Sequence, residues 1–346
     1  ADSIDTVPQQ FNEVKPTLIT SVPKLLETVR KKVLNNIQKE SKAKQKIFSW
    51  AIEVGKKKFI NDTNKKFNPI INAEYKLAEK LVYSKVRERL GGRLKKVISG
   101  GAPLQTEVEL FFGAIGIHIT QGYGLTETSP VVSANRFNEI EIGTIGKPLP
   151  GVDVKLAVDG EILVKGPNVM KGYWNDPVST KQTIDEEGWL YTGDIGVFTN
   201  RGNLKITDRK KNLFVSSGGK NIAPQPIESL ITQSRFIEHC ILIGDNREYI
   251  TALISPNFEQ LENLAREFDI EYNSLSELIT NQKIINHLKE EIDYYQKDVS
   301  KFEKIRKFRI LSEPFSTSGG ELSPKLSIKR FEVEKKYSYL IESMYD

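Results

Sequence analysis

The sequence predicts an α/β layer, then a small distorted antiparallel β-barrel, then a small α+β domain. Three features predict this order. Up to about residue 142, apolar strand-like runs alternate with glycine turns and helical patterns. Residues 143–210 contain short alternating runs separated by turn residues. From residue 211 onward, helical patterns return between strand-like runs. We therefore expect domains at residues 1–142, 143–210 and 211–346.

The composition is that of an ordinary soluble protein. The 346 residues are 38% hydrophobic and 27% charged, and the formal net charge of +5 fits anionic ligands without requiring nucleic acid. The single Cys240 lies in an apolar run typical of a buried strand, and one cysteine cannot form an internal disulfide. These features, with no signal-peptide core and no apolar run of about 18 residues, favour a cytoplasmic protein. The start at Ala1, without methionine, reads as part of a longer protein.

The first ninety residues predict a short strand followed by helices. The strand falls within residues 14–22, and a helical, lysine-rich stretch runs from Pro23 to about residue 67. Its lysines either form a surface for anionic lipid or nucleic acid, or line a solvated helix face. Peripheral contact with the inner face of a membrane therefore stays open. A third helix is expected at residues 72–90, closed by two glycines.

Two strand–glycine units follow. The first is a strand at residues 96–99 that runs into glycines and then a helix from about residue 104, so that backbone N–H groups would point at an anion. The second combines the alternation of Ile115, Ile117 and Ile119 with the sequence QGYGLTET at residues 121–128. Its glycines allow close backbone approach to a ligand, its tyrosine is flat, and its glutamate suits magnesium. An ordinary glycine turn is the alternative.

Later elements are predicted from alternation and turn residues. Barrel strands are expected at residues 152–156, 161–164, 196–199 and 204–207, with a hairpin at Asp159-Gly160. We then expect a hairpin, a helix at 226–233, strands at 237–244 and 250–256, helices within 258–301 and a strand at 308–311.

Six motifs in order resemble the AMP-forming acyl-adenylate family, and within it the long-chain fatty acid–CoA ligases. They are SGGAPL (99–104), QGYGLTET (121–128), GTIGKPLPG (143–151), GEILVKGPNVMKGYW (160–174), GWLYTGD (188–194) and TDRKKNLFVSSGGKNIAPQPIE (207–228). One motif alone is weak, but six in order are specific. The resemblance implies a partial adenylate-forming large domain followed by a mobile C-terminal lid.

The resemblance also implies chemistry: ATP-dependent activation of a fatty acid with Mg²⁺, then transfer to CoA. Thr126 would bond the α-phosphate and Glu127 would ligate the metal. The residues implied to contact the nucleotide are Gly100, Gly101, Ala102, Gln121, Gly122, Tyr123, Asp194 and Arg209, with Tyr123 on the adenine and the last two on the ribose. Each of the polar residues also has an ordinary structural explanation, such as a turn aspartate or a surface ion pair.

The C-terminal part is implied to move and to meet CoA. Lys211 stands at the family's hinge, about which the lid would rotate. Gly218 and Gly219 would let a pantetheine arm pass, and Lys220 would meet CoA phosphates. A flexible surface hairpin is the alternative.

The sequence departs from the family in two places. The family's C-terminal lysine aligns with Ser327, so Lys325 or Lys329 would have to replace it as a catalytic cation. No phosphate loop precedes residue 98. We therefore expect this chain alone to form acyl-adenylate at a negligible rate.

Two other functions stay open. An acyl-carrier protein could accept the acyl group in place of CoA. Alternatively, residues 23–67 could serve a non-catalytic nucleic-acid-binding or membrane-binding module, although the main interpretation expects no nucleic acid.

Overall fold

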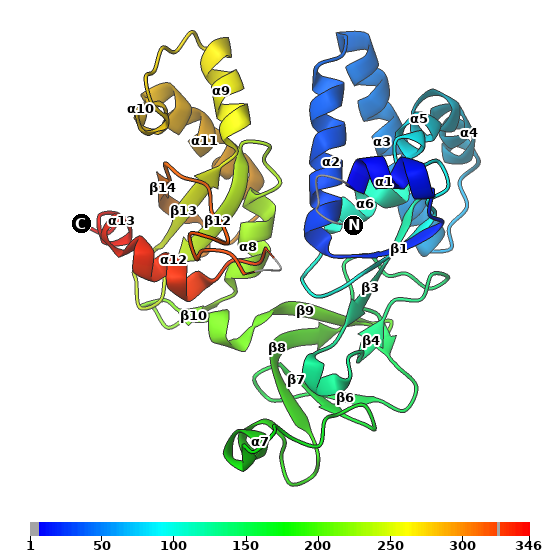
Figure 1. The fold of residues 1–346 in the computed structure, drawn as a ribbon, viewed down its shortest axis with the longest axis vertical. Helices are drawn as coiled ribbons and strands as arrows, with labels where there is room; N and C mark the ends of the chain where they lie inside the picture. The colour runs from blue at the N-terminus through cyan, green and yellow to red at the C-terminus, as the bar shows by residue number, and fades with distance from the viewer. Residues whose placement is uncertain (1–6, 324–325) are drawn as a thin grey trace. The chain divides into compact units, whose positions relative to one another are not determined.

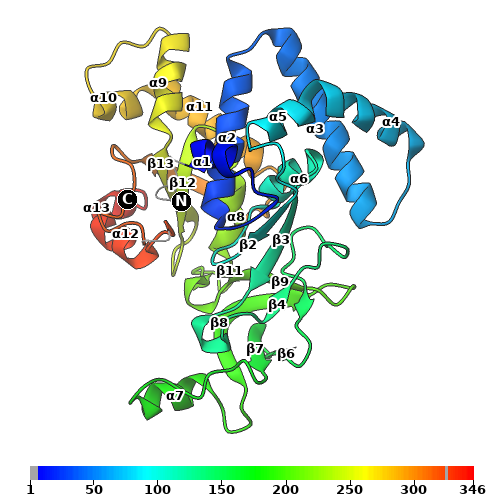
Figure 2. The same ribbon diagram turned by 45° about the vertical axis from the view of Figure 1, so that its right-hand side comes forward.

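The structure, a computed structural model, describes residues 7–323 and 326–346. The chain divides into two compact units, Ala1–Ile206 and Thr207–Asp346, which Figures 1 and 2 show from two directions. The buried hydrophobic clusters also fall within one unit or the other. Each unit is therefore described by itself. The predicted subdivision of the first unit near residue 142 stays a prediction.

The first unit begins with a helical layer. Its elements are α1 (Val7–Val14), β1 (Leu18–Ser21), α2 (Pro23–Gln38), α3 (Lys42–Thr63), α4 (Pro69–Ala78), the π-helical η1 (Glu79–Tyr83) and α5 (Ser84–Glu88). The lysine-rich stretch is thus two helices, and the third predicted helix begins at Pro69, three residues early. Asn68 explains this start, because its side chain accepts hydrogen bonds from the backbone N–H groups of Ile70 and Ile71.

A mixed sheet of order β1-β2-β3-β4-β5 supports this layer. Strands β1, β2 (Lys96–Ser99) and β3 (His118–Tyr123) are parallel, whereas β4 (Ser133–Ala134) and β5 (Lys147–Pro148) are antiparallel to their neighbours. Ser99 pairs with Gln121, so the two glycine stretches leave the sheet at the same edge. Both glycine stretches are thereby placed side by side.

The connection between β2 and β3 corrects two expectations. Helix α6 (Thr106–Ala114) starts two residues later than predicted, so residues 102–105 separate the first glycine turn from its N-terminus. Ile115 caps α6 and does not belong to the strand, which begins only at His118. A helix end and a strand start that bury three isoleucines in alternation look like one longer strand in the sequence.

A curled half-barrel completes the first unit, and its last strand continues three residues past the division at residue 206. Its strands run in the order β6 (Asp153–Leu156), β7 (Glu161–Lys165), β8 (Leu190–Phe198) and β9 (Leu204–Arg209), and α7 (Pro177–Thr183) lies between β7 and β8. The predicted strand at 196–199 is only the end of β8. Its earlier part includes Thr192-Gly193.

The second unit is a three-stranded sheet, β12-β13-β14, covered on both faces. Its elements are η3 (Lys210–Asn212), β10 (Phe214–Val215), β11 (Asn221–Ile222), α8 (Pro224–Ile231), β12 (Ile237–Ile243), β13 (Ile250–Pro256), α9 (Phe258–Glu267), α10 (Leu275–Thr280), α11 (Gln282–Tyr295), β14 (Ile305–Ile310), α12 (Arg330–Lys336) and α13 (Ser338–Glu342). Residues of α8–α11 pack on one face and residues of α12 and α13 on the other. Every residue of β13 is buried, as expected for a central strand between two helical layers.

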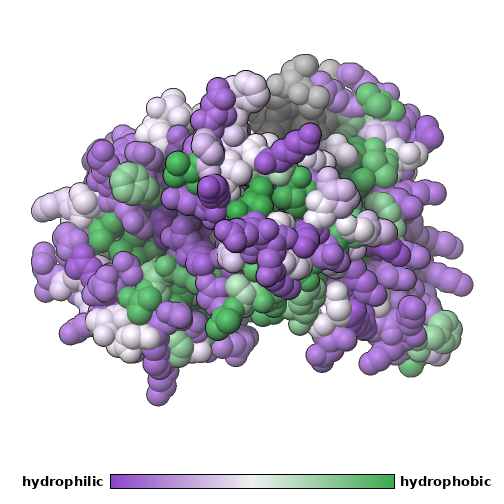
Figure 3. Space-filling model, turned by 90° about the horizontal axis from the view of Figure 1, so that it is seen from below, coloured by the Kyte–Doolittle hydropathy of each residue, from purple (hydrophilic) through white to green (hydrophobic). Residues whose placement is uncertain are grey.

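The face in Figure 3 is largely hydrophilic, with hydrophobic side chains scattered over it. Among the residues that the structure describes, none of the helices is both long and apolar enough to cross a bilayer.

A buried ion pair fastens α12 onto the second unit. The guanidinium of Arg330 contacts the Glu228 carboxylate on α8 and donates to the Leu242 carbonyl at 2.6 Å, and the Leu242 N–H donates to Glu228 at 2.8 Å. The side chains of Arg330 and Glu228 are only 20% and 15% exposed. The pair therefore joins α8, β12 and α12 through one set of charge-assisted hydrogen bonds.

We predict that Arg330→Ala destabilises the second unit by about 3–5 kcal/mol, because it leaves the buried Glu228 carboxylate without its cation. Urea unfolding followed by circular dichroism measures this loss. Fluorescence of Trp50, Trp174 and Trp189, all in the first unit, should not change. Lys335→Ala, at an exposed position of the same helix, is the control. A loss below about 1 kcal/mol, the scale of a surface pair, would contradict the prediction.

Candidate nucleotide-binding site

A hydrogen bond between two buried side chains lies at the centre of the site. The Tyr123 hydroxyl, at the end of β3, donates to Oδ2 of Asp194 in β8 at 2.7 Å. The two residues are 8% and 5% exposed, respectively. Tyr123 also belongs to the hydrophobic cluster of the half-barrel, with Val132 and Ile162 among its members. Tyr123 therefore belongs to the sheet and also packs in the core of the half-barrel, and only a small part of its side chain reaches solvent.

A β-bulge aims Asp194 at this tyrosine. Between the pairs Glu161↔Ile195 and Leu163↔Tyr191, the β7–β8 register shifts because β8 contains additional residues. Gly193 takes φ +71°, a value that favours glycine. Its N–H donates to the buried Glu161 carboxylate at 2.9 Å, and the Thr192 hydroxyl donates to the Ile162 carbonyl at 2.8 Å. Asp194 is therefore a strand residue oriented by a bulge, and not the turn aspartate that was its ordinary structural alternative.

The glycines at the sheet edge divide into two kinds. A Cβ atom at Gly101 or Gly122 would meet no heavy atom within 4 Å, so the space beside both backbones is open. A Cβ at Gly100 would lie 3.3 Å from the Gly122 carbonyl oxygen. A Cβ at Gly124 would lie 1.6 Å from the Pro130 carbonyl oxygen, which makes this glycine a packing requirement. The open positions are those at which a ligand could approach the backbone. Ala102, the next residue along, is exposed.

The segment after Gly124 presents a hydroxyl and a carboxylate. Thr126 is exposed in the short 3-10 turn η2 (Thr126–Thr128). The Glu127 Oε1 accepts a hydrogen bond from the Tyr173 hydroxyl at 2.9 Å, and the Glu127 carbonyl accepts one from the Met170 N–H at 2.8 Å. Loop residues 168–173 thus hold the glutamate in place.

At this site the protein offers Mg²⁺ one carboxylate and not a complete set of protein ligands. Within residues 7–323 and 326–346, no group of three or more His, Cys, Asp or Glu side chains is arranged to hold a metal ion. Magnesium characteristically uses one or two carboxylates and completes its shell with water and substrate phosphates. A single, half-buried Glu127 fits that mode of binding.

The remaining predicted residues belong to the second unit. Arg209 is the last residue of β9 and Lys211 lies in η3, and both are exposed. Gly218 and Gly219 form the exposed tip between β10 and β11. The Lys220 ammonium lies 4.0 Å from the centroid of the Phe302 ring, within the same unit.

The two candidate replacements for the family lysine differ in how far they can be described. Lys329 is exposed, and its backbone N–H donates to the Glu321 carbonyl at 2.8 Å immediately before α12. Lys325 lies outside the described residues. Ser327 is exposed in the loop that the Leu322–Ile328 bridge closes. The choice between the two lysines stays a prediction.

Sequence reasoning missed Glu109, which lies under the site. It is fully buried on α6, and its Oε2 accepts hydrogen bonds from the Gly143 N–H at 2.9 Å and from the Gln121 side chain at 3.3 Å. Its other oxygen has no hydrogen-bond partner among the described residues. Burial raises the pKa of Glu109 to about 7 in spite of these two donors. The predicted site residue Gln121 therefore directs its side chain into the protein.

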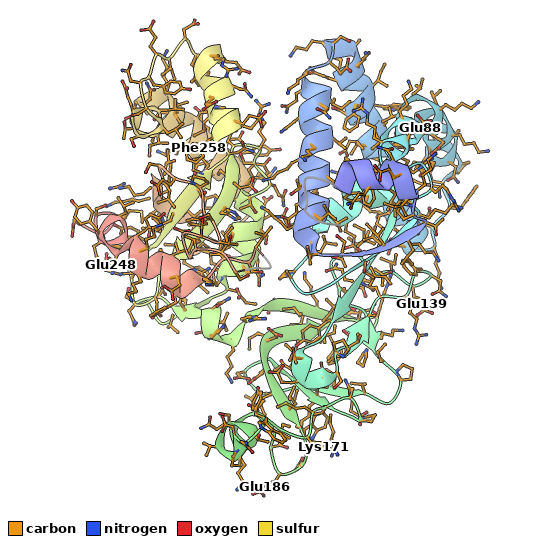
Figure 4. All side chains as sticks on the ribbon, viewed as in Figure 1. Glu88, Glu139, Lys171, Glu186, Glu248 and Phe258 are labelled. Carbon is orange, nitrogen blue, oxygen red and sulfur yellow. The ribbon has the colours of Figure 1, made fainter. Side chains whose placement is uncertain are left out.

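A cavity of about 460 Å³ lies away from these residues. It is lined from the start of β3 by His118, from α3 by Phe59 and Asp62, and from a loop by Glu139, which Figure 4 labels. It therefore opens beside the amino end of β3, whereas Tyr123 ends the same strand. We do not assign the nucleotide to it.

Comparison with known sequences decides the family. The profile of the AMP-binding enzyme family matches residues 2–174, and that of the AMP-binding enzyme C-terminal domain matches residues 211–346. The chain belongs to the AMP-binding enzyme family. The resemblance inferred from the six motifs is thereby confirmed.

Two similar curated proteins are named long-chain-fatty-acid–CoA ligases. Long-chain-fatty-acid–CoA ligase FadD15 of Mycobacterium bovis is 36% identical over 335 residues, which are 96% of this chain and 55% of that protein. Long-chain-fatty-acid–CoA ligase 5 of Rattus norvegicus is 34% identical over 99% of this chain and 51% of its own length. The chain thus spans about half the length of the curated relatives that it matches.

Solved structures of AMP-binding enzymes share the fold. The adenylation domain of a carboxylate reductase from Mycobacterium chelonae has a TM-score of 0.72 at 22% identity, over 100% of this chain and 49% of that one. The A-PCP didomain of carboxylic acid reductase from Segniliparus rugosus, in complex with AMP, has a TM-score of 0.71 at 21% identity, over 100% and 44% of the two chains. These likenesses confirm an adenylate-forming fold.

We predict that Glu109 makes the first unit less stable as the pH rises. The native state raises the pKa of Glu109 from 4.5 to about 7, so folded Glu109 keeps a proton that the unfolded chain releases. Its contribution is fully present below the unfolded pKa and is lost as the pH rises toward 7, a change of about 3 kcal/mol. Unfolding free energies across this window should fall less steeply for Glu109→Gln. Glu88→Gln, at an exposed position labelled in Figure 4, should retain the wild-type slope. Equal slopes for wild type and Glu109→Gln would show the prediction to be wrong.

We predict opposite outcomes for two glycines of one motif. Gly124→Ala should lower the unfolding free energy by about 1–3 kcal/mol, because the Pro130 carbonyl must move. Gly122→Ala should change it by no more than about 0.5 kcal/mol, because its side chain meets open space. Thermal unfolding of both variants tests the contrast, and similar losses in both would contradict it.

Proposed function

We propose that this chain is part of an enzyme that activates a long-chain fatty acid with ATP and transfers the acyl group to CoA. The buried Tyr123–Asp194 pair at an open glycine edge is the observation that carries the proposal. The names of the relatives support the fatty acid as substrate and favour CoA over a carrier protein as acceptor.

The nucleoside would lie against the open edge of the first unit. Gly100, Gly101 and Ala102 would border the base, and the part of Tyr123 that reaches solvent would stack on it. The Asp194 carboxylate has two oxygens and would accept the ribose hydroxyls. The hydrogen bond from Tyr123 holds this carboxylate in one orientation before any ligand arrives, which lowers the ordering cost of binding.

Charge would be neutralised by residues on the segment after the glycines. The carboxylate attack on ATP brings two anions together, so the site must supply positive charge and hydrogen-bond donors. Thr126 is exposed and would donate to the α-phosphate. Glu127 would hold Mg²⁺, which supplies positive charge to the phosphates when bound. The Tyr173 hydroxyl would keep the glutamate aimed during binding.

The second unit would provide the groups for the ribose, the hinge and the thioester step. Arg209 would donate to the ribose, and Lys211 would act as the hinge residue. The exposed tip at Gly218 and Gly219 would leave room for pantetheine, and Lys220 would move off the Phe302 ring to meet a CoA phosphate. Lys329 or Lys325 would supply the cation that Ser327 cannot.

Nucleotide binding tests the proposal most directly. Calorimetric titration with a non-hydrolysable acyl-adenylate analogue should give saturable binding to the wild-type chain. Asp194→Asn should weaken it by about tenfold or more, since hydrogen bonds to a charged acceptor contribute ~1.5–3 kcal/mol. Tyr123→Phe keeps the ring and should weaken binding less. Tyr123→Ala also removes the stacking surface and should weaken it more.

Thermal unfolding of each variant separates lost binding from lost folding. Unchanged affinity in folded Asp194→Asn would contradict the ribose assignment, and a wild-type chain that binds no analogue would contradict the site as a whole. ATP–pyrophosphate exchange by this chain should be negligible, since the expected phosphate loop is not in its sequence.

A further inference from the structure

Glu109 joins two segments of the site that are far apart in the sequence. Its Oε2 accepts hydrogen bonds from the Gly143 N–H at 2.9 Å and from the Gln121 side-chain amide at 3.3 Å. Glu109 is fully buried and Gln121 is 7% exposed. Gln121 begins the sequence QGYGLTET, and Gly143 begins GTIGKPLPG, a motif to which the proposed function gives no role. One carboxylate of α6 therefore connects both motifs.

The alternation of β3 directs the Gln121 side chain toward α6. Because side chains of a strand alternate between its two faces, Gln121 shares its face with Ile119. Ile119 packs in the core cluster to which Val108 and Phe112 of α6 also belong. Figure 2 shows α6 next to β3. The strand that leads to the second glycine stretch thus lies against the helix that carries Glu109.

A second set of hydrogen bonds closes this connection into a ring. The Asn135 N–H donates to the Gln121 carbonyl at 3.0 Å, and the Asn135 side-chain amide donates to the Thr144 carbonyl at 2.5 Å. Asn135 and Thr144 are each 3% exposed, and Thr144 follows Gly143 directly. We call Glu109, Gln121, Asn135, Thr144 and Gly143 the Glu109 ring. It is a buried polar network, and such networks are costly to leave partly satisfied.

The Glu109 ring fixes the residue that precedes the open glycine edge. Gly122 follows Gln121, and a Cβ atom at Gly100 would lie 3.3 Å from the Gly122 carbonyl oxygen, so the two glycine stretches pass close to each other. Tyr123, the next residue, ends β3 with its hydroxyl on Asp194. A displacement of Gln121 would therefore move both the glycine edge and the tyrosine ring.

Glu109 is the member of the ring whose chemistry can be changed most cleanly. Its Oε2 accepts both hydrogen bonds, whereas its other oxygen has no hydrogen-bond partner among the described residues. In Glu109→Gln, the amide oxygen can accept the same two bonds, and the amide nitrogen takes the place of the oxygen without a partner. Glu109→Leu keeps a side chain of similar size but has no acceptor. The two changes therefore separate the acceptor from the volume that it occupies.

We propose that Glu109 is a positioning residue for the nucleotide, which sets the end of β3, and so the places of Gly122 and Tyr123, without touching the ligand. This inference rests on the proposed nucleotide site at the glycine edge. An edge that is held in place before binding lowers the ordering cost of binding. Loss of the acceptor should therefore weaken nucleotide affinity in a chain that still folds, whereas loss of a packing residue would lower stability alone.

Titration with the non-hydrolysable acyl-adenylate analogue tests this inference. Glu109→Leu should bind about tenfold more weakly than wild type, because two buried donors lose their acceptor and the edge is no longer held. Glu109→Gln should bind within about twofold of wild type, since its carbonyl oxygen keeps both bonds. Gln121→Met removes one bond and should weaken binding about threefold.

Two further measurements control for folding and for the helix itself. Thermal unfolding shows which variants are folded at the titration temperature, and Gln121→Met keeps the test decisive if Glu109→Leu does not fold. Glu107→Leu is the matched control on α6. The Glu107 carboxylate pairs with Lys56 of α3 at 3.0 Å and lies outside the Glu109 ring, so its loss should leave the affinity unchanged.

Amide hydrogen exchange tests the positioning without any nucleotide. The Gly143 N–H donates to Glu109, and the Asn135 N–H donates to the Gln121 carbonyl, so the two groups report on the two sides of the ring. Both should exchange about tenfold faster or more in Glu109→Leu and at the wild-type rate in Glu109→Gln. The Leu242 N–H, which donates to Glu228 in the second unit, should not change in either variant.

Three results would overturn the inference. They are wild-type affinity in folded Glu109→Leu, faster exchange at Gly143 but not at Asn135, and an affinity of Glu109→Gln as low as that of Glu109→Leu. The second result would confine Glu109 to its own turn, and the third would assign its effect to charge. A wild-type chain that binds no analogue would instead contradict the proposed nucleotide site, and the exchange rates would still decide whether Glu109 sets the end of β3.

Discussion

The hydrogen bond from Tyr123 to Asp194 is the constraint on which the site depends. Two buried polar groups 71 residues apart are hydrogen-bonded to each other, and removing this bond while both stay buried would cost about 1–3 kcal/mol. The bond also fixes the half-barrel against the last residue of β3. The carboxylate proposed to bind the ribose is therefore oriented by a hydrogen bond that also stabilises the fold.

Much of this arrangement could be predicted from local sequence, and its long-range part could not. Glycine spacing, apolar alternation and turn residues predicted strands that the structure has as β2 and β13, and the hairpin at the tip of β10–β11. Glu109 and Glu161 were missed as site residues because their partners, Gly143 and Gly193, are 34 and 32 residues away. The bulge at Asp194 was missed for a related reason. A Thr-Gly pair favours a turn locally, and only pairing with β7 makes it part of a strand.

Three buried glutamates, Glu161, Glu109 and Glu228, differ in the partners that their carboxylates have. Glu161 is 4% exposed and receives the Gly193 N–H, so its charge stabilises a backbone geometry beside the ligand edge. Burial raises the pKa of Glu109, and one of its oxygens has no hydrogen-bond partner among the described residues. In the second unit, Glu228 is held by a guanidinium as well as by backbone. Burial raises the pKa of both Glu109 and Glu228, and the partners of each carboxylate decide whether it holds a local backbone geometry or joins helices.

Because Cys240 is buried, its reactivity reports the local opening of the second unit. This thiol is 1% exposed on β12, and burial raises its pKa well above the ordinary range, so little thiolate exists to react while the sheet is intact. As the chain has no other cysteine, the rate of alkylation measures how often β12 opens to solvent. The three tryptophans, confined to the first unit, report the other half by fluorescence. The unmodified chain therefore carries separate optical and chemical probes for the unfolding of its two halves.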